Sequence, residues 1–98
     1  MHPCQMRLMK RAKVIVSWSA GLHLRPAARL ARLAQRFRSS ISLRFGGRIA
    51  DLRSILSVIA LCATMGATID VEAAGDDEQN AIDAVEQLFS SGDADDGS

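Results

Sequence analysis

The sequence predicts an α+β fold, an open-faced sandwich with the element order βαββαβα, in which four antiparallel strands carry three helices on one face. Two kinds of periodicity lead to this prediction: some segments alternate apolar and polar residues, and others repeat apolar residues every three to four positions. A third observation is the pair Gly46-Gly47 between two alternating segments. This pair is typical of a two-residue hairpin turn, so the strands on either side are expected to be antiparallel neighbours.

The first half of the chain is expected to form two strands and one long helix. Residues 1–11 are expected to be a flexible lead-in, and the alternation over residues 14–18 predicts the first strand. Apolar residues then recur with helical spacing over residues 24–37, which predicts a helix. Pro26 is tolerated in its first turn, because the N–H that proline lacks would have no acceptor there. The second strand is predicted over residues 41–45.

The second half supplies the remaining strands and helices. After the glycine pair, residues 48–51 are predicted to return as a third strand, and residues 54–61 to form a second helix. Residues 69–73 alternate and predict a fourth strand. An acidic turn at residues 75–78 favours the start of a last helix, which is expected to end before Gly92. The solvent-facing side of the sheet is expected to carry Ser17, Ser42, Arg44, Asp70 and Glu72.

Length and composition are typical of one small domain. The 98 residues are assigned to a single domain over residues 12–90 and a disordered acidic tail over residues 91–98. No apolar run approaches the roughly 20 residues of a membrane helix, and two cysteines do not make a disulfide framework. A cytoplasmic protein without membrane insertion is therefore expected. His2, Cys4 and Cys62 lack the spacing of metal ligands, so neither a metal site nor a cofactor is expected.

Charge is segregated along the chain although the net charge is only +1. All 12 Lys and Arg lie between Arg7 and Arg53, whereas ten of the 11 acidic residues follow Ser54. Such asymmetry occurs in nucleic-acid-binding proteins and in proteins that dock on acidic protein surfaces, and it also arises from solvated helix faces. One face of the first predicted helix, which could steer an acidic partner, is formed by Arg25, Arg29, Arg32 and Arg36.

The most informative stretch is Gly-Leu-His-Leu-Arg-Pro-Ala-Ala at residues 21–28. It places His23 at a junction between a loop and a helix, where the first N–H groups have no partner within the helix and favour an anion. Arg25 can offer its guanidinium to phosphate oxygens. Because neutral imidazole is a competent nucleophile, these groups could receive a transferable phosphoryl group. Taken alone, a histidine in this position is more often a cap or a surface residue.

Residues 21–28 resemble the active-site signature of the HPr family, the histidine phosphocarriers of the phosphoenolpyruvate-dependent sugar phosphotransferase system. Gly46-Gly47 falls where that family turns its hairpin, and residues 51–58 resemble its second-helix segment around a regulatory serine. The resemblance covers roughly residues 12–90 without an evident gap. It implies the HPr-like form of the predicted sandwich, and a transiently phosphorylated carrier rather than an enzyme.

The resemblance also implies individual roles. His23 would be the phosphorylated residue, through its Nδ1 atom, and Arg25 would stabilise the phosphoryl group. The donor would be enzyme I, charged from phosphoenolpyruvate, and the acceptor the A domain of a sugar-specific enzyme II. The protein is expected to act as a monomer.

Ser54 precedes an apolar helical segment, and two roles remain open for it. An arbitrary serine at this place is most often a helix N-cap. By the resemblance, it would be the site modified by HPr kinase/phosphorylase in bacteria that have this enzyme. A phosphate there would add about −1.5 to −2 charges beside the docking surface and weaken the binding of enzyme I. Both roles can hold for the same residue.

An interface for partners is expected on the second helix. Val58 and Leu61 should face the core, whereas the neighbouring apolar face is exposed in related proteins and contacts their partners. The alternative is that this face is core as well. With the first helix included, the expected docking residues are Leu24, Arg32, Ile55, Leu56 and Ile59.

One departure from the family pattern lies at the end of the second helix. Many relatives carry a small residue there, often glycine, whereas this chain has Cys62. If the position requires a positive φ, cysteine costs on the order of 1 kcal/mol.

Three functions follow as hypotheses. The first is a phosphocarrier in sugar uptake, and the second is a regulatory HPr paralogue of the nitrogen-branch type, which controls other proteins through its phosphorylation state. The third is a nucleic-acid-binding module, suggested by the arginine face. It is disfavoured because the chain has only four aromatic residues and no recognisable nucleic-acid-binding motif. No nucleic-acid partner is therefore expected.

Overall fold

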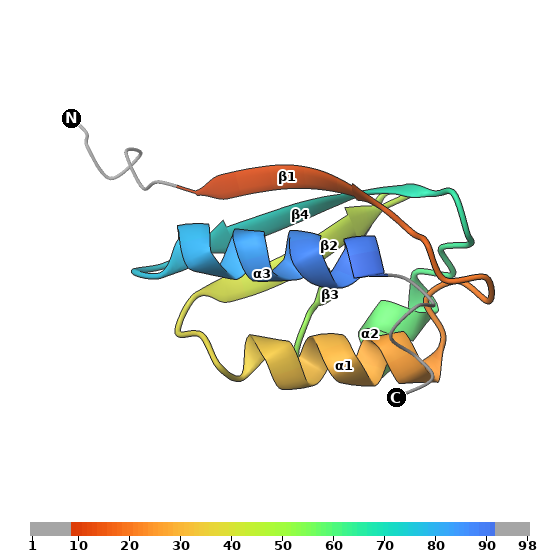
Figure 1. Cartoon of the computed structure of the whole chain (residues 1–98), viewed down its shortest axis with the longest axis horizontal. Coiled ribbons are helices and arrows are strands. Elements are labelled where there is room, and N and C mark those ends of the chain that lie inside the picture. Colours follow the sequence, from red (N-terminus) through yellow and green to blue (C-terminus); the bar gives the residue numbers. More distant parts are fainter. Residues whose placement is uncertain (1–8, 92–98) are drawn as a thin grey trace.

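The computed structural model describes residues 9–91, and their order of elements is the predicted βαββαβα (Figure 1). The sheet order is β1-β4-β2-β3, and all neighbouring strands are antiparallel. The helices cover one face of this sheet, which confirms the predicted α+β open-faced sandwich (Figure 1). The elements are β1 (Lys10–Ile15), α1 (Leu24–Ala34), β2 (Ser40–Phe45), β3 (Arg48–Asp51), α2 (Ile55–Ala60), β4 (Thr68–Ala74) and α3 (Glu78–Ser91).

The start of β1 differs from its prediction. Lys10 already pairs with Ala73 of β4, so the strand starts two residues before the predicted domain boundary. Its first residues are charged and their partners lie far along the chain, so no local alternation of apolar residues marks them. Residues 1–8 of the predicted lead-in and residues 92–98 of the predicted tail lie outside the described residues.

The hairpin and the end of α1 follow from local geometry. Gly46 and Gly47 have φ values of 59° and 79° and join β2 to β3, which confirms the predicted two-residue turn. α1 ends at Ala34, three residues before its predicted end. The amides of Arg36 and Phe37 donate to carbonyls three residues earlier, at 3.0 and 3.2 Å, so the last turn tightens and leaves the helical path.

The core lies between the sheet and the helices. Its largest members are fully buried, and the rings of Trp18 and Phe89 lie 4.9 Å apart, which holds α3 against the segment that leads to α1. Ser17, which was expected on the solvent-facing side, donates a hydrogen bond to the carbonyl of Phe89. The strand pattern no longer applies there because β1 ends at Ile15. Among residues 9–91, no helix is long and apolar enough to cross a membrane.

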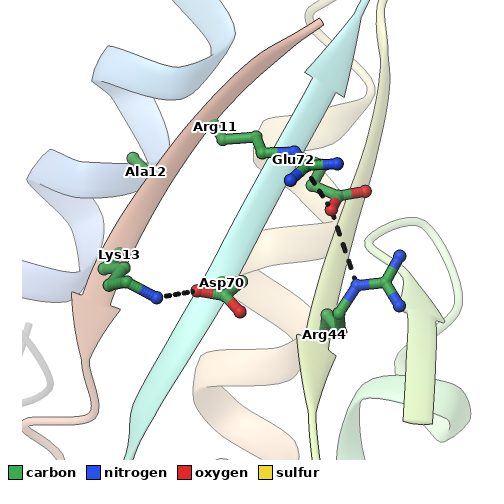
Figure 2. A pocket seen from close by; sticks show the side chains of 6 residues that line it. All are labelled: Arg11, Ala12, Lys13, Arg44, Asp70 and Glu72. Carbon is green, nitrogen blue, oxygen red and sulfur yellow. Dashed lines mark hydrogen bonds and ion pairs between the residues drawn. The ribbon is translucent and has the colours of Figure 1, made fainter. Parts of the chain in front are cut away.

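The open face of the sheet carries a ladder of ion pairs (Figure 2). Lys13 donates to Asp70 at 2.7 Å, and Glu72 lies 3.5 Å from both Arg11 and Arg44. The hydrogen bond from Lys13, with the positive charges around it, lowers the pKa of Asp70. Ser42 pairs with Glu72 across β2 and β4 and so shares this face, and the predictions for Ser42, Arg44, Asp70 and Glu72 are confirmed. The hollow here is lined by three cations and two carboxylates that pair with one another, and it lies on the side of the sheet away from the helices.

Cys62 adopts the conformation that its departure from the resembled family pattern raised as a possibility. Its φ is 58°, and it is the one non-glycine residue with positive φ in the described part of the chain. Cys62→Gly is therefore expected to stabilise the fold by about 0.5–1 kcal/mol, somewhat less than the relieved strain because glycine also loosens the unfolded chain. Thermal unfolding should show a Tm higher by about 2–8 °C. Cys62→Ser keeps the strain and serves as the control, and equal Tm values for the two variants would contradict this account.

Asp77 ties the start of α3 to the segment before β2. Its carboxylate accepts hydrogen bonds from the amides of Arg38 and Ser39, both at 3.0 Å, and from the Ser39 hydroxyl. These bonds, that of the Ser39 side chain first, lower the pKa of Asp77. The backbone of Gly75 lies so close to Ser39 that a Cβ on Gly75 would come within 2.7 Å of the Ser39 Cα. The sequence showed the acidic turn but not this long-range partner.

The lowered pKa of Asp77 predicts an acid-dependent loss of stability. A carboxyl whose folded pKa lies below its unfolded value stabilises the fold above the unfolded pKa and loses this contribution as the pH falls through the folded value. The free energy of unfolding should therefore drop below about pH 4. In the Asp77→Asn variant, the free energy of unfolding should be smaller at neutral pH and should change less as the pH falls. Urea unfolding from pH 7 to 2.5 measures both, and parallel curves for the two proteins would refute the link.

Candidate functional site

His23 occupies the N-cap position of α1. Its backbone is extended, with φ −93° and ψ −165°, and its carbonyl accepts the first helical hydrogen bond from Ala27 at 3.1 Å. The imidazole is half-buried and makes no capping hydrogen bond. His23 thus stands at the start of α1, where the first-turn amides have no acceptor within the helix, and its side chain is not used as a cap. A negative group beside this ring would be favoured by the helix dipole.

The loop before His23 is fixed by backbone contacts on both sides. The amide of Leu22 donates to the carbonyl of Ala63 at 3.0 Å, and its side chain is buried. The amide of Gly21 donates to the carbonyl of Trp18 at 2.8 Å, and the amide of His23 to that of Gly21 at 2.9 Å. The backbone of His23 is therefore fixed by its own helix and, through Leu22, by the segment after α2. The sequence motif predicted the helix start but not the contact with Ala63.

Arg25 lies in the first turn of α1, two residues after His23, and is exposed to solvent. Pro26 is buried in the same turn, and its missing N–H leaves no unsatisfied donor there. A guanidinium in this turn can bind an anion from the solvent side while the amides at the start of the helix donate to the same anion. The site thus combines one imidazole, one exposed guanidinium and a helix N-terminus.

Ser54 is the N-cap of α2, as the first of its two predicted roles requires. Its side chain accepts a hydrogen bond from the amide of Ser57 at 3.3 Å and donates to the Ser57 hydroxyl at 2.9 Å. The N-cap prediction is confirmed. The hydroxyl is half-buried, and modification of Ser54 stays a prediction.

The predicted docking residues divide into two classes. Leu24 and Leu56 are 63% and 79% exposed, which is unusual for leucine, and Arg32 is exposed too. Ile55 and Ile59 are only half-buried and pack against the core, so the expectation of an exposed face holds for them in part. Ile55 and Ile59 are only partly covered because α2 has six residues and buries only Val58 completely. Val58 and Leu61 are buried as expected.

Arg53 is a structural residue that the sequence did not reveal. Its guanidinium donates to the carbonyls of Ala34 and Phe37, at 3.0 and 2.8 Å, and so satisfies acceptors at the C-terminal end of α1. Because Arg53 directly precedes Ser54, this contact joins the end of α1 to the start of α2. Its partners lie far away in sequence, and no local motif signals them. Over residues 9–91, no cluster of three or more histidine, cysteine or acidic residues could hold a metal ion.

Comparison with known proteins agrees with this geometry. The family model described as the PTS HPr component phosphorylation site matches residues 10–91. The chain is 38% identical to the phosphocarrier protein HPr of Cupriavidus necator over 82 residues, which cover 84% of this chain and 91% of the relative. It is 40% identical to the phosphocarrier protein NPr of Proteus mirabilis over 81 residues, which cover 82% and 90%.

The fold comparison leads to the same group of proteins. The structure of HPr-C-His from Thermoanaerobacter tengcongensis superposes with a TM-score of 0.80 at 32% identity, covering 84% of this chain and 92% of the other. Both the family match and the superposition extend over most of the described residues.

Proposed function

Because this chain belongs to the HPr family of phosphotransferase-system phosphocarriers, we propose that it accepts a phosphoryl group on His23 from enzyme I and passes it to the A domain of a sugar-specific enzyme II. The observation that carries the proposal is the position of the half-buried His23 at the N-cap of α1, where its side chain makes no capping hydrogen bond. The family is a phosphoryl carrier and not a catalytic enzyme. We place this exchange in the cytoplasm, where phosphoenolpyruvate is available to enzyme I.

The transfer is a displacement at phosphorus. A ring nitrogen of neutral His23, Nδ1 by the family resemblance, forms a bond to phosphorus while the bond to the donor's histidine nitrogen breaks, and the donor ring keeps that electron pair. The equatorial oxygens carry negative charge throughout, so amides at the start of α1 and the Arg25 guanidinium stabilise them. The second transfer reverses these roles, with His23 as the leaving group. Positioning supplies most of the rate enhancement because little covalent work falls to the protein.

The half-exposed ring suits a carrier that meets two partners in turn. Exposed leucines from α1 and α2, Leu24 and Leu56, offer an apolar surface that either partner can cover. The exposed arginines of α1 give that surface a positive border, which favours partners with acidic surfaces. Phosphorylation of Ser54 would place negative charge next to Leu56 and weaken such docking, and we propose this as its effect wherever HPr kinase/phosphorylase is present.

The proposal is tested by phosphorylating the full chain with purified enzyme I and phosphoenolpyruvate. Mass spectrometry should show one added phosphoryl group, and peptide mapping under mildly basic conditions should locate it on His23. The label should be lost in acid and pass to a sugar-specific enzyme II A domain upon mixing. Uptake of an acid-stable group on a serine, or no uptake at all, would contradict the proposal.

The regulatory alternative shares the same site chemistry. The relative NPr, at 40% identity, is as similar to this chain as the relative HPr at 38%, so identity does not separate the two roles. A competition experiment separates the two roles. Equal amounts of a sugar-branch and a nitrogen-branch A domain are mixed with the phosphorylated chain. We expect the sugar-branch domain to be charged first, and preferential charging of the other would favour the regulatory role.

A further inference from the structure

A basic groove between α1 and α3 lies outside the site around His23, although one of its residues, Arg32, is also a predicted docking residue. The groove encloses about 370 Å³ and is lined by Arg29, Arg32, Leu33, Arg36 and Leu88. Three of these five residues are arginines from α1 and the turn that follows it, and α3 contributes only the apolar Leu88. A surface with this composition fits a short anionic segment with small apolar parts.

The positive charge of the groove is incompletely matched by the fold itself. Among the residues the structure describes, no ion pair joins Arg32 or Arg36 to a carboxylate, and both side chains are exposed. The acidic residues of the sheet are engaged elsewhere, since Asp70 and Glu72 pair with cations on the opposite face. The groove therefore keeps an attractive potential for an added anion.

We propose that the groove binds the acidic segment of the same chain over residues 92–98, whose sequence is Gly-Asp-Ala-Asp-Asp-Gly-Ser. Three of these seven residues are aspartates, and the exposed guanidinium groups of Arg32 and Arg36 offer them complementary charge. Leu88 lines the groove and lies three residues before Ser91, where α3 ends, so the segment starts about one helical turn from the groove.

The reach of the segment is sufficient. Seven extended residues span up to about 25 Å, whereas the seven-residue spacing from Arg29 to Arg36 corresponds to roughly 10 Å along a helix. The tether also gives the segment a local concentration in the millimolar range or above, so individually weak ion pairs suffice for binding. No external partner at ordinary concentration has this advantage.

The location gives such binding a consequence for the carrier. The C-terminal end of α3 and the N-terminal end of α1 lie at the same end of the molecule (Figure 1), so the segment follows α3 at the end of the molecule where His23 precedes α1. Resting on the proposed function, we infer that the segment competes with acidic partners for the arginines of α1 and slows docking at low ionic strength. The same contact would discourage partners that lack enough charge to displace it.

Binding is tested in the full chain with a variant that carries Asp93→Asn, Asp95→Asn and Asp96→Asn, which removes the charges but keeps length and size. The matched control removes three charges elsewhere through Asp76→Asn, Asp83→Asn and Glu86→Gln. The Nε–Hε NMR signals of Arg32 and Arg36 should move in the first variant and not in the control. In the unaltered chain the same signals should move when salt is raised from about 20 mM to about 500 mM.

The rate of phosphorylation by enzyme I tests the consequence. The segment variant should be charged about three- to tenfold faster than the unaltered chain at about 20 mM salt, and equally fast at about 500 mM. Arg36→Gln should reduce this ratio. Unmoved arginine signals, or equal rates with normal labelling of His23, would overturn the inference. Absence of labelling in every chain would instead overturn the proposed function.

Discussion

Replacement of His23 by alanine is expected to abolish phosphoryl uptake while the domain stays folded. The imidazole makes no capping hydrogen bond, so its loss should change the free energy of unfolding by no more than about 1 kcal/mol. Its loss removes the nucleophile itself, and neither the helix amides nor Arg25 can form a bond to phosphorus. Uptake from enzyme I should therefore fall by at least about a thousandfold, to the detection limit of a labelling assay.

The chain provides its own control for this experiment. His2 is the only other histidine, and His2→Ala should retain full labelling. Circular dichroism and the fluorescence of Trp18, the single tryptophan, report whether His23→Ala is folded. A folded His23→Ala protein that still takes one acid-labile phosphoryl group would falsify the assignment of the site.

Much of the fold could be predicted because it follows from periodicity that each segment carries by itself. The apolar face of α1, the alternation of β2 and β4, and the glycine turn at Gly46 and Gly47 all depend on neighbours in sequence. The start of α1 at Leu24 was fixed in the same way by Pro26 and the motif around it. These features survive in the structure because packing and local preference agree.

The features that could not be predicted depend on residues far apart in the chain. The charged start of β1 is ordered by its ladder with β4, and Ser17 turns to α3 because the sheet has already ended. The guanidinium of Arg53 and the carboxylate of Asp77 each bind backbone groups of other elements. A sequence shows that such side chains are present, but only the assembled fold shows which acceptors and donors lie within reach.

The candidate site shows the same division. His23, Arg25 and Ser54 were identified from local motifs and from the resemblance that those motifs carry, and the structure places His23 and Ser54 at helix N-caps and Arg25 in a first turn. The carbonyl of Ala63, which holds the loop before His23, has no signature in the sequence because any residue supplies a carbonyl. Gly21 is the one hint in the sequence, but the reason why this position requires glycine becomes clear only when the neighbouring carbonyl of Ala63 is known.

Gly21→Ala is expected to damage both stability and phosphoryl transfer. Gly21 has φ +75°, and a Cβ built on it would lie 2.5 Å from the carbonyl oxygen of Ala63 and 3.2 Å from the Cα of Thr64. These are backbone atoms of a segment next to the core, so they cannot turn aside as a side chain would. The left-handed backbone alone costs alanine about 1–2 kcal/mol, and relief of the overlap must shift the same carbonyl that binds the amide of Leu22.

Gly66→Ala separates the two contributions, because Gly66 also has a left-handed φ, +92°, but a Cβ there meets nothing within 4 Å. It should lower the free energy of unfolding by about 1–2 kcal/mol and leave the phosphorylation rate unchanged. Gly21→Ala should lose at least about twice as much stability. Its rate of charging by enzyme I should fall about tenfold or more at a temperature where both variants are folded, because a displacement of about 1 Å at a reacting group can cost that much.

Equal stability and equal rates in the two variants would mean that the contact with Ala63 is incidental. A slow but folded Gly21→Ala protein would show that a carbonyl 40 residues away from His23, on the segment after α2, keeps the imidazole in place.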